Sequence, residues 1–525
     1  MGAFKISIII LLVLICIILL FKAVYLIKGA RTSTSFFLLN GKLKTIPFIN
    51  TMVMTDLSFR TILMSALVGY IFNFKGIFFG IISIVTTIVG YWIFKKHFKK
   101  FIKDVNNGGS LPEFISSLFI NGNNQEKIKY LRFCISVVSM LILIVSIIFE
   151  LHIADIIFSS IFGIDTVIVF FSLLGSITLY AILGGYKSII VTDVIQAFML
   201  ILACMAAAYF MIEFKPEHTI ELELNPEPVL GVESNPITKF LRLFVSFLSG
   251  FVWLLTTTES WQRFSATRSF KVSNKGVLWS GLFKVIALVL FMIFGIYFKD
   301  IIEPVLQYYQ TDTSQEEFLI IDFFKISDYV FQIGLKIALA IIFVGLLMCA
   351  VSTVDTYLIA MSHSFTSDIV INKHQKSLGN LNAYENRRYN YVGKIAIIMM
   401  AFIIMLFWYF LKMTDLLKDP VYFFFFASSF QFILFPLLLI GLFVKKTNIY
   451  ALIISIILGV ATTFFSWFYI LNFSSGSMFL LNISKENGIK TLPLFILLVT
   501  SVSFIICNYL PAIFMQVCSI KKRAR

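Results

Sequence analysis

Apolar stretches about 20 residues long recur along this chain, and they restrict its fold more than any other feature. An α-helix of that length crosses the hydrocarbon core of a bilayer. Lipid offers no hydrogen-bond partners, so each stretch has to satisfy its own backbone groups, and an α-helix does so internally. The chain is also 59% hydrophobic and only 14% charged, which is too little charge to cover a water-exposed surface. These features predict an all-α integral membrane protein.

The boundaries of the apolar stretches predict about 13 transmembrane helices. We place them at 6–27, 47–73, 76–94, 133–158, 164–183, 188–211, 239–258, 277–298, 333–362, 391–411, 420–443, 448–471 and 491–515. The connecting loops are too short for a separate soluble domain, so we expect one membrane domain. The first stretch has no small-residue cleavage site, and we expect it to remain as a helix rather than to be removed as a signal peptide.

Basic residues are concentrated in alternate loops between the stretches. About 27 fall in one set of loops, Arg263 among them, and about 9 fall in the other set, which predicts an outer N-terminus and an inner C-terminus. The basic residues behind the net charge of +15 are therefore distributed mainly among the loops on one side of the bilayer, and they do not form a patch for nucleic acid. Residues 109–120, in an inner loop, predict a short amphipathic helix at the membrane surface. The six cysteines fall in or beside apolar stretches and predict no disulfide framework.

Two of the stretches contain polar residues that a lipid-facing helix would not carry. The second stretch holds Asp56, Ser58 and Arg60, and the seventh holds Gly250 and Trp253 in a run of small and polar residues. The two lie five stretches apart, which is the spacing of two five-helix halves that each begin with a discontinuous helix. We therefore expect a 5+5 inverted-repeat core.

The predicted core divides the single membrane domain, residues 1–525, into three parts. Residues 1–46 add an N-terminal helix and an inner loop, residues 47–443 form the core, and residues 444–525 add C-terminal helices and a basic tail. The core boundaries follow from the positions of the two polar stretches.

A row of polar residues in the ninth stretch predicts a cation site. Its members, spaced at i, i+3, i+4 and i+7, share one helical face: Cys349, Ser352, Thr353 and Thr356. Asp355 lies at the edge of that face, and Asp193 is a second carboxylate at membrane depth, in the sixth stretch. Sodium prefers oxygen ligands such as hydroxyls, carboxylates and freed backbone carbonyls. The alternative is that the hydroxyls bond to the preceding helical turn and that an aspartate pairs with a lysine.

Four segments resemble, in order, landmarks of the sodium/solute symporter family. They are Gly184–Gln196, Trp261–Ser269, Ser352–Thr356 and Gly441–Asn448. The resemblance implies a leucine-transporter-type fold and a secondary active symporter that imports a small organic solute by alternating access. It implies no enzyme activity and no cofactor, with sodium as the coupling ion.

The resemblance also implies the sodium ligands. The sodium site common to the family maps onto the backbone carbonyls of Met54, Leu57 and Cys349 and onto the hydroxyls of Ser352 and Thr353. Some family members bind a second sodium ion, and we therefore expect two sodium ions here. The residues that the resemblance assigns to the second site are Asp193, Ser352, Asp355 and Thr356.

The substrate residues are predicted from the polar stretches and from the resemblance. Lys284 resembles a lysine that sugar-transporting relatives place near substrate, but those relatives carry a glutamine where this chain has Phe423–Phe426. Arg60 follows the expected helix break, where a guanidinium holds a carboxylate with two hydrogen bonds. The alternative is an ion pair with Glu150, Asp155 or Glu259. Trp253 either closes the substrate pocket from the inner side or packs against neighbouring side chains. The candidate set is Asp56, Ser58, Arg60, Gly250, Trp253 and Lys284.

Other functions remain open from the sequence. A sugar symporter or a proton-coupled carrier, with Asp193 or Asp355 titrating, would have the same architecture. A membrane-embedded acyl- or glycosyltransferase is a more distant alternative, because no His–Asp or Cys–His arrangement suggests catalysis. A transporter-like sensor would carry an appended signalling domain. We expect a protein that works as a monomer in the cytoplasmic membrane, with the bilayer, sodium and a small solute as its partners.

Overall fold

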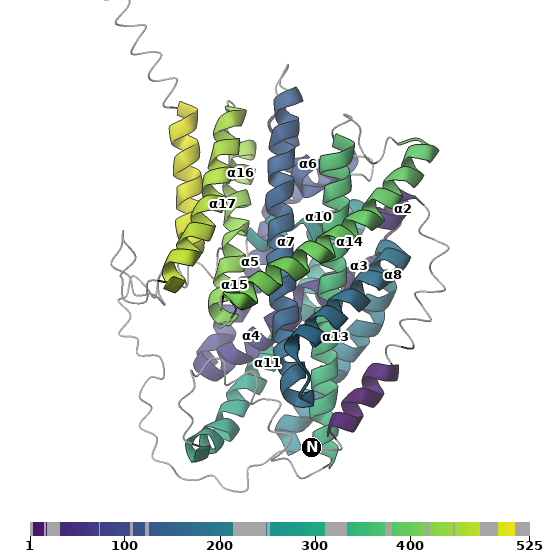
Figure 1. Cartoon of the computed structure of the whole chain (residues 1–525), viewed down its shortest axis with the longest axis vertical. Coiled ribbons are helices and arrows are strands. Elements are labelled where there is room, and N and C mark those ends of the chain that lie inside the picture. The colour runs from purple at the N-terminus through teal and green to yellow at the C-terminus, as the bar shows by residue number, and fades with distance from the viewer. Residues whose placement is uncertain are drawn as a thin grey trace, which may run out of the picture.

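The structure, a computed structural model, is a bundle of helices (Figure 1). It describes residues 4–14, 17, 32–72, 74–104, 109–120, 125–213, 248, 252–309, 333–372, 378, 381–414, 417, 420–444, 447–472 and 492–509. Within these ranges the strand-type pairing consists of one isolated bridge, between Leu43 and Thr267. The prediction of an all-α membrane protein is confirmed.

The named helices follow the apolar stretches. They are α2 (Ser33–Leu38), η2 (Leu39–Gly41), α3 (Thr45–Asp56), α4 (Phe59–Phe72), α5 (Phe74–Asp104), α6 (Leu111–Ser117), α7 (Gln125–Phe162), α8 (Thr166–Glu213), α10 (Thr258–Ala266), α11 (Phe270–Tyr309), α13 (Ile333–Ser364), η4 (Phe365–Ile371), α14 (Ala383–Met413), α15 (Pro420–Ser429), α16 (Gln431–Phe443) and α17 (Ile449–Asn472). Residues 4–14 and 492–509 are also helical.

Eight of the described helices are long and apolar enough to cross a membrane, and α3 with α4 forms a ninth, bent span. The predicted spans 164–183 and 188–211 belong to one named helix, α8, which is interrupted at Gly185 (φ 57°, ψ −159°). That backbone conformation is open almost exclusively to glycine. Most of the predicted span 239–258 lies outside the described residues, so the count of about 13 helices stays a prediction.

The predicted break in the second stretch is present between α3 and α4. Leu57 ends α3 with non-helical dihedrals (φ −89°, ψ 58°), and the two helix axes bend by 59°. Ser58 caps the start of α4, because its hydroxyl accepts the N–H of Thr61 at 3.2 Å. The chain turns here because a helix end leaves backbone carbonyls without intrahelical partners.

A second interruption lies at Thr257. Residues 252–256 are helical, Thr257 is extended (φ −97°, ψ 124°), and α10 begins at Thr258. Gly250 and its neighbours 249 and 251 lie outside the described residues. The polar part of the seventh stretch therefore contains a helix break on its C-terminal side.

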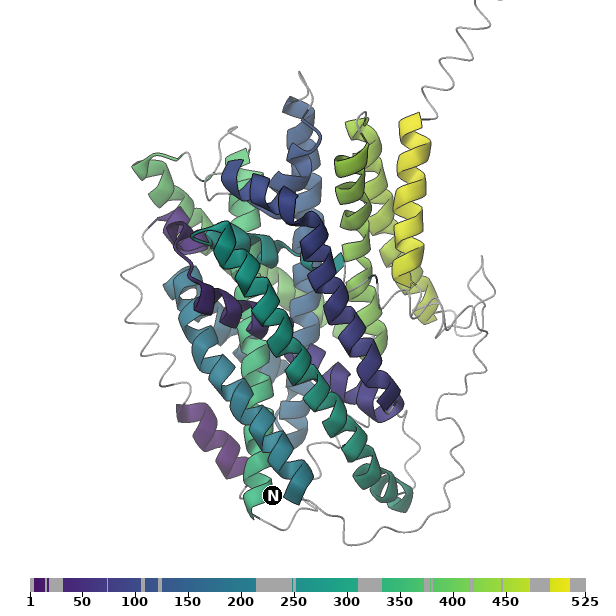
Figure 2. The ribbon, with the colours of Figure 1, turned by 180° about the vertical axis from the view of Figure 1, so that it is seen from behind.

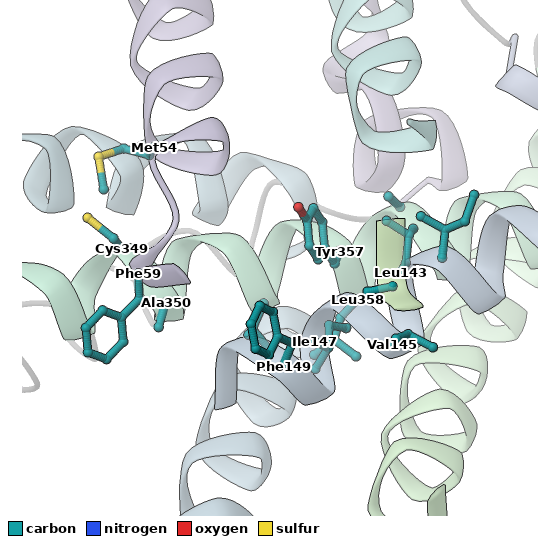
Figure 3. Packing of buried hydrophobic residues seen from close by; sticks show 14 of the residues in the cluster. Met54, Phe59, Leu143, Val145, Ile147, Phe149, Cys349, Ala350, Tyr357 and Leu358 are labelled. Carbon is teal, nitrogen blue, oxygen red and sulfur yellow. The ribbon is translucent and has the colours of Figure 1, made fainter. Parts of the chain in front are cut away.

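The core of the bundle lies where α8 packs along α13. Gly345 of α13 permits close approach, since a Cβ added there would lie 2.6 Å from the Cβ of Ala203 on α8. Figure 3 shows Met54 and Phe59, on either side of the first break, next to Cys349 and Ala350 of α13, with Phe149 of α7 beside them. The helices α3, α7, α8 and α13 thus pack against one another in the core.

The predicted amphipathic helix at 109–120 is α6, which begins at Ser110. The Ser110 hydroxyl accepts the N–H of Glu113 at 3.2 Å. Most of α6 is buried against the bundle, and Arg132 at the start of α7 contacts Glu113 at 3.2 Å. Burial raises the pKa of the Glu113 carboxyl, and the charge of Arg132 opposes that shift.

Candidate functional site

Two helices bring a carboxylate and a hydroxyl together in the middle of the bundle. The Ser352 hydroxyl of α13 donates to Asp193 Oδ1 of α8 at 2.6 Å, and Thr356 donates to Asp355 at 3.4 Å. All four side chains are at most 1% exposed. Among the described residues, no complete hydrogen bond is formed to the second oxygens of Asp193 and Asp355, although the Thr51 hydroxyl lies near Asp193. The four residues predicted for a second sodium therefore lie together, with carboxylate oxygens open to a cation.

The five residues predicted for the first sodium come from the end of α3 and from the same face of α13. Met54 and Leu57 are fully buried at the first helix break, and the Met54 side chain lies beside Cys349 (Figure 3). The hydroxyl of Thr353 donates to the Cys349 carbonyl at 2.9 Å, so the alternative of a bond to the preceding turn holds for Thr353. A hydroxyl that donates one hydrogen bond still has lone pairs to offer to a cation.

Arg263 is a buried cation beside these carboxylates, and its predicted place in an inner loop is wrong. It is 0% exposed in α10, where its Nε donates to Thr51 Oγ1 at 3.2 Å and its Nη2 donates to Thr55. The Thr51 hydroxyl also contacts Asp193. A basic residue directly after an apolar stretch has the pattern of a membrane anchor, so its position gave no sign of burial. The sequence feature that pointed to Arg263 is its position in the segment Trp261–Ser269, which resembles a landmark of the symporter family.

An ion pair lies at the break between α3 and α4. Lys284 of α11 donates to Asp56 Oδ2 in the last turn of α3, and the Lys284 side chain is 9% exposed. Both residues belong to the predicted substrate set, and the structure brings them together. Because each neutralises the other, the pair adds no net charge to the region.

Arg60 forms a buried ion pair with Glu150 of α7, which was one of the alternatives. Arg60 Nε lies 3.3 Å from Glu150 Oε1, and the Arg60 N–H donates to Oε2 at 3.2 Å. Its guanidinium carbon lies 5.6 Å from the ring centre of Phe149 and 5.3 Å from that of half-buried Trp253. Asp155 instead lies 3.4 Å from His152. The role of Arg60 in substrate binding stays a prediction, and Gly250 of the substrate set lies outside the described residues.

Glu259 is a buried carboxylate near Arg60, and it was considered beforehand only as an ion-pair partner. It lies in the first turn of α10, is 1% exposed, and feels the charges of Arg263 and Arg60. The signal for it in the sequence was its position directly after the polar run in the seventh stretch.

The aromatic residues of α15 are those that the family resemblance predicts to replace a glutamine of sugar-transporting relatives. Phe423 is buried against Phe149 of α7, with ring centres 5.6 Å apart. It also lies 6.2 Å from Trp467 of α17. These contacts make an apolar wall and leave no hydrogen-bonding side chain at Phe423 for a sugar hydroxyl.

The chain was compared with known proteins. The model of the sodium:solute symporter family matches residues 36–459. A sodium-coupled sialic acid symporter, solved in a substrate-bound outward-open state, is 18% identical with a TM-score of 0.66, over 96% of this chain and 97% of that chain. This likeness is evidence for the fold.

Other comparisons add little. A mutant of the manganese transporter of Eremococcus coleocola is 14% identical over 91% of this chain and 95% of that chain, with a TM-score of 0.39, too low to support an argument. No curated protein sequence matches the chain.

Proposed function

Because the chain belongs to the sodium:solute symporter family, we propose that it imports a small organic solute across the cytoplasmic membrane by alternating access. It is a transporter and not an enzyme, and sodium-coupled symport is the activity of its family. We place the N-terminus outside and the C-terminus in the cytoplasm, on the distribution of basic residues.

The observation that carries this proposal is the contact between Ser352 and Asp193. It joins a hydroxyl and a carboxylate of two helices at a point that is fully buried, and it leaves one oxygen of Asp193 open among the described residues. Two carboxylates at this depth, with Arg263 as the cation beside them, are unfavourable, so a bound cation has a large effect on the packing of α8 against α13.

Two sodium ions are proposed per solute. The first uses the carbonyls of Met54, Leu57 and Cys349 with the hydroxyls of Ser352 and Thr353. The helix end at Leu57 supports this set, because carbonyls in the last turn of α3 lack intrahelical partners. The second ion uses Asp193, Ser352, Asp355 and Thr356, which lie together between α8 and α13.

The solute is proposed to bear a carboxylate and to bind between the two helix breaks. Arg60 supports this, because an arginine presents five N–H donors in a planar fork. A neutral sugar is the alternative, and the apolar wall at Phe423 argues against it. Coupling to protons in place of sodium is the second alternative, with Asp193 or Asp355 as the titrating group.

A transport assay tests the proposal. The protein is reconstituted in liposomes, and uptake of labelled carboxylates, amino acids, sugars and vitamins is measured with an inward gradient of sodium or of potassium. We expect at least one solute to accumulate with sodium and not with potassium. Accumulation driven by a proton gradient in the absence of sodium would contradict sodium coupling, and accumulation of a sugar alone would contradict the carboxylate.

A further inference from the structure

Glu259 is a buried carboxylate that neither the proposed sodium sites nor the ion pairs of Arg60 and Lys284 use. It follows extended Thr257 in the first turn of α10 and is 1% exposed. Its own N–H, the Thr257 side chain and the charge of Arg263 act on it, but among the described residues no hydrogen bond to either of its oxygens is complete. An ionised carboxylate here is unfavourable unless a cation or a hydrogen-bond donor reaches it. Glu259 therefore indicates a ligand group with a positive charge or with N–H donors.

Arg60 lies near Glu259, at the other helix break. Its guanidinium faces the ring of Trp253 at 5.3 Å, and Trp253 belongs to the helical turn directly before Thr257. The charge of Arg60 acts on Glu259, and both charges act on the phenol of Tyr357 in α13. The region between the breaks thus presents a guanidinium and a carboxylate within one buried cluster.

Among the described residues, the charged side chains around the two breaks carry an excess of two negative charges. Five carboxylates and three cationic groups are buried or half-buried there: Asp56, Glu150, Asp193, Glu259 and Asp355, against Arg60, Arg263 and Lys284. Two sodium ions, as proposed above, would make this set neutral. Because net charge at membrane depth is unfavourable, a solute with no net charge of its own fits the loaded site best.

We propose that the solute is a zwitterion, whose carboxylate binds Arg60 and whose ammonium group binds Glu259. This inference rests on the proposed function and narrows its substrate class. A guanidinium has five donors, so Arg60 can hold Glu150 and a solute carboxylate together. The ammonium group supplies donors to the open oxygens of Glu259. A simple carboxylate would instead leave Glu259 without a solute ammonium group and add one negative charge.

Ligand binding to the purified full-length protein tests this class. The probes are the common amino acids, the 2-hydroxy acids with the same side chains, and the primary amines that lack the carboxylate. Thermal unfolding is followed in sodium chloride and in potassium chloride. We expect sodium-dependent stabilisation by at least one amino acid, and at least tenfold weaker binding of its hydroxy acid and its amine, because each lacks one of the two charged contacts.

The variant Glu259→Gln keeps the size of the side chain and removes its charge. We expect its affinity for the amino acid to fall at least tenfold, while its affinity for the hydroxy acid stays unchanged or rises. Glu126→Gln, at the exposed start of α7, is the matched control and should bind as the wild type does. Stabilisation by sodium without solute reports that each variant is folded.

The outcomes separate this inference from the proposed function. Equal binding of amino acid and hydroxy acid, or an unchanged amino-acid affinity in Glu259→Gln, would overturn the zwitterion. So would stabilisation by sodium with no response to any amino acid. If sodium itself fails to stabilise the wild type relative to potassium, with or without solute, the proposed sodium-coupled function is rejected instead.

Discussion

At the scale of single residues, hydroxyls and carboxylates decide where a cation can bind. Ser352 stands at the centre, since it belongs to both proposed sodium sites and donates to Asp193 at 2.6 Å. Thr353, its neighbour, donates to the Cys349 carbonyl in the preceding turn. A bound sodium ion would keep both hydroxyl oxygens as ligands and would require Ser352 to turn its hydrogen away from the ion.

The double variant Ser352→Ala with Thr353→Ala removes two oxygen ligands without adding bulk. We expect the sodium concentration for half-maximal uptake to rise at least tenfold, which corresponds to a loss of about 1.4 kcal/mol or more. Uptake measured against sodium concentration checks this. Ser455→Ala with Thr463→Ala is the matched control, because these buried hydroxyls of α17 donate to carbonyls of their own helix at 2.8 Å. Unchanged sodium dependence in the first variant would reject the site.

Arg60 provides a second test at this scale. Arg60→Lys keeps the charge beside Glu150 but loses the planar fork, so solute affinity should fall while sodium binding changes little. Arg60→Ala should weaken solute binding further, by about 2–5 kcal/mol if the contact is desolvated.

Arg60→Ala also leaves Glu150 buried without its partner, so its effect on folding needs a control. The double variant Arg60→Ala with Glu150→Ala removes both charges and should recover thermal stability without recovering solute affinity. Full recovery of affinity in the double variant would assign Arg60 to the scaffold alone.

At the scale of the elements, the end of α13 is joined to α6 and α7 by a buried ionic network. The π-helical turn η4 follows α13 and carries Asp368. Arg132 of α7 donates to Asp368 Oδ1 at 2.8 Å, Ser110 donates to the same oxygen at 2.5 Å, and Ser364 donates to Oδ2 at 2.8 Å. Asp368 thus holds the start of α6 and the start of α7 to the helix that carries the proposed sodium ligands.

Asp368→Asn removes the fully buried one of the two carboxylate charges that face Arg132, and we expect a loss of about 3–5 kcal/mol in the free energy of unfolding. Reversible unfolding in mixed detergent measures this loss. The triple variant Arg132→Leu, Asp368→Leu and Glu113→Gln removes all three charges of the network and should be more stable than Asp368→Asn, because no unpaired charge stays buried. A single variant as stable as the wild type would show that the network carries little of the packing of α6.

At the scale of the whole molecule, a group of C-terminal helices stands beside the part that contains the broken helices. In both views α16, α17 and the helix at 492–509 stand together on one side of the bundle, away from α8 and α13 (Figures 1 and 2). The charged residues of the site therefore lie within the part formed by α3, α4, α7, α8, α10, α11 and α13. Coupling of sodium binding to solute transport requires that binding or release of the ions changes how these helices pack against one another.

Ion stoichiometry is the property of the whole transporter that tests this coupling. We expect a Hill coefficient for sodium near two in the wild type, falling towards one in Asp193→Asn and in Asp355→Asn, because each variant removes a carboxylate ligand of the second ion. At saturating sodium, the solute affinity of each variant should change less than the dependence of its uptake on sodium concentration. Sodium-dependent uptake and direct sodium binding check both. A wild type that binds one ion would show that the second site is wrong.

Local properties of the sequence were enough to predict the class of fold and the position of the first helix break. Apolar length and helical period act within one segment, so they predicted spans such as α7 and α13 and placed Ser352 and Thr353 on one face. The polar residues at 50–61 predicted the interruption, because a continuous lipid-facing helix does not tolerate them. The meeting of Asp193 with Ser352 was implied by family resemblance and not by any local pattern.

The partners of the charged side chains were decided by the tertiary structure alone. Arg263 has the sequence pattern of a surface anchor, yet it is fully buried against Thr51 and Thr55 of α3. Lys284 pairs with Asp56 on another helix, and Glu150 was one of three partners that the sequence allowed for Arg60. The physical reason is that burial of a charge is tolerable only beside an opposite charge or a hydrogen-bond partner, and helix packing determines which distant residue supplies it.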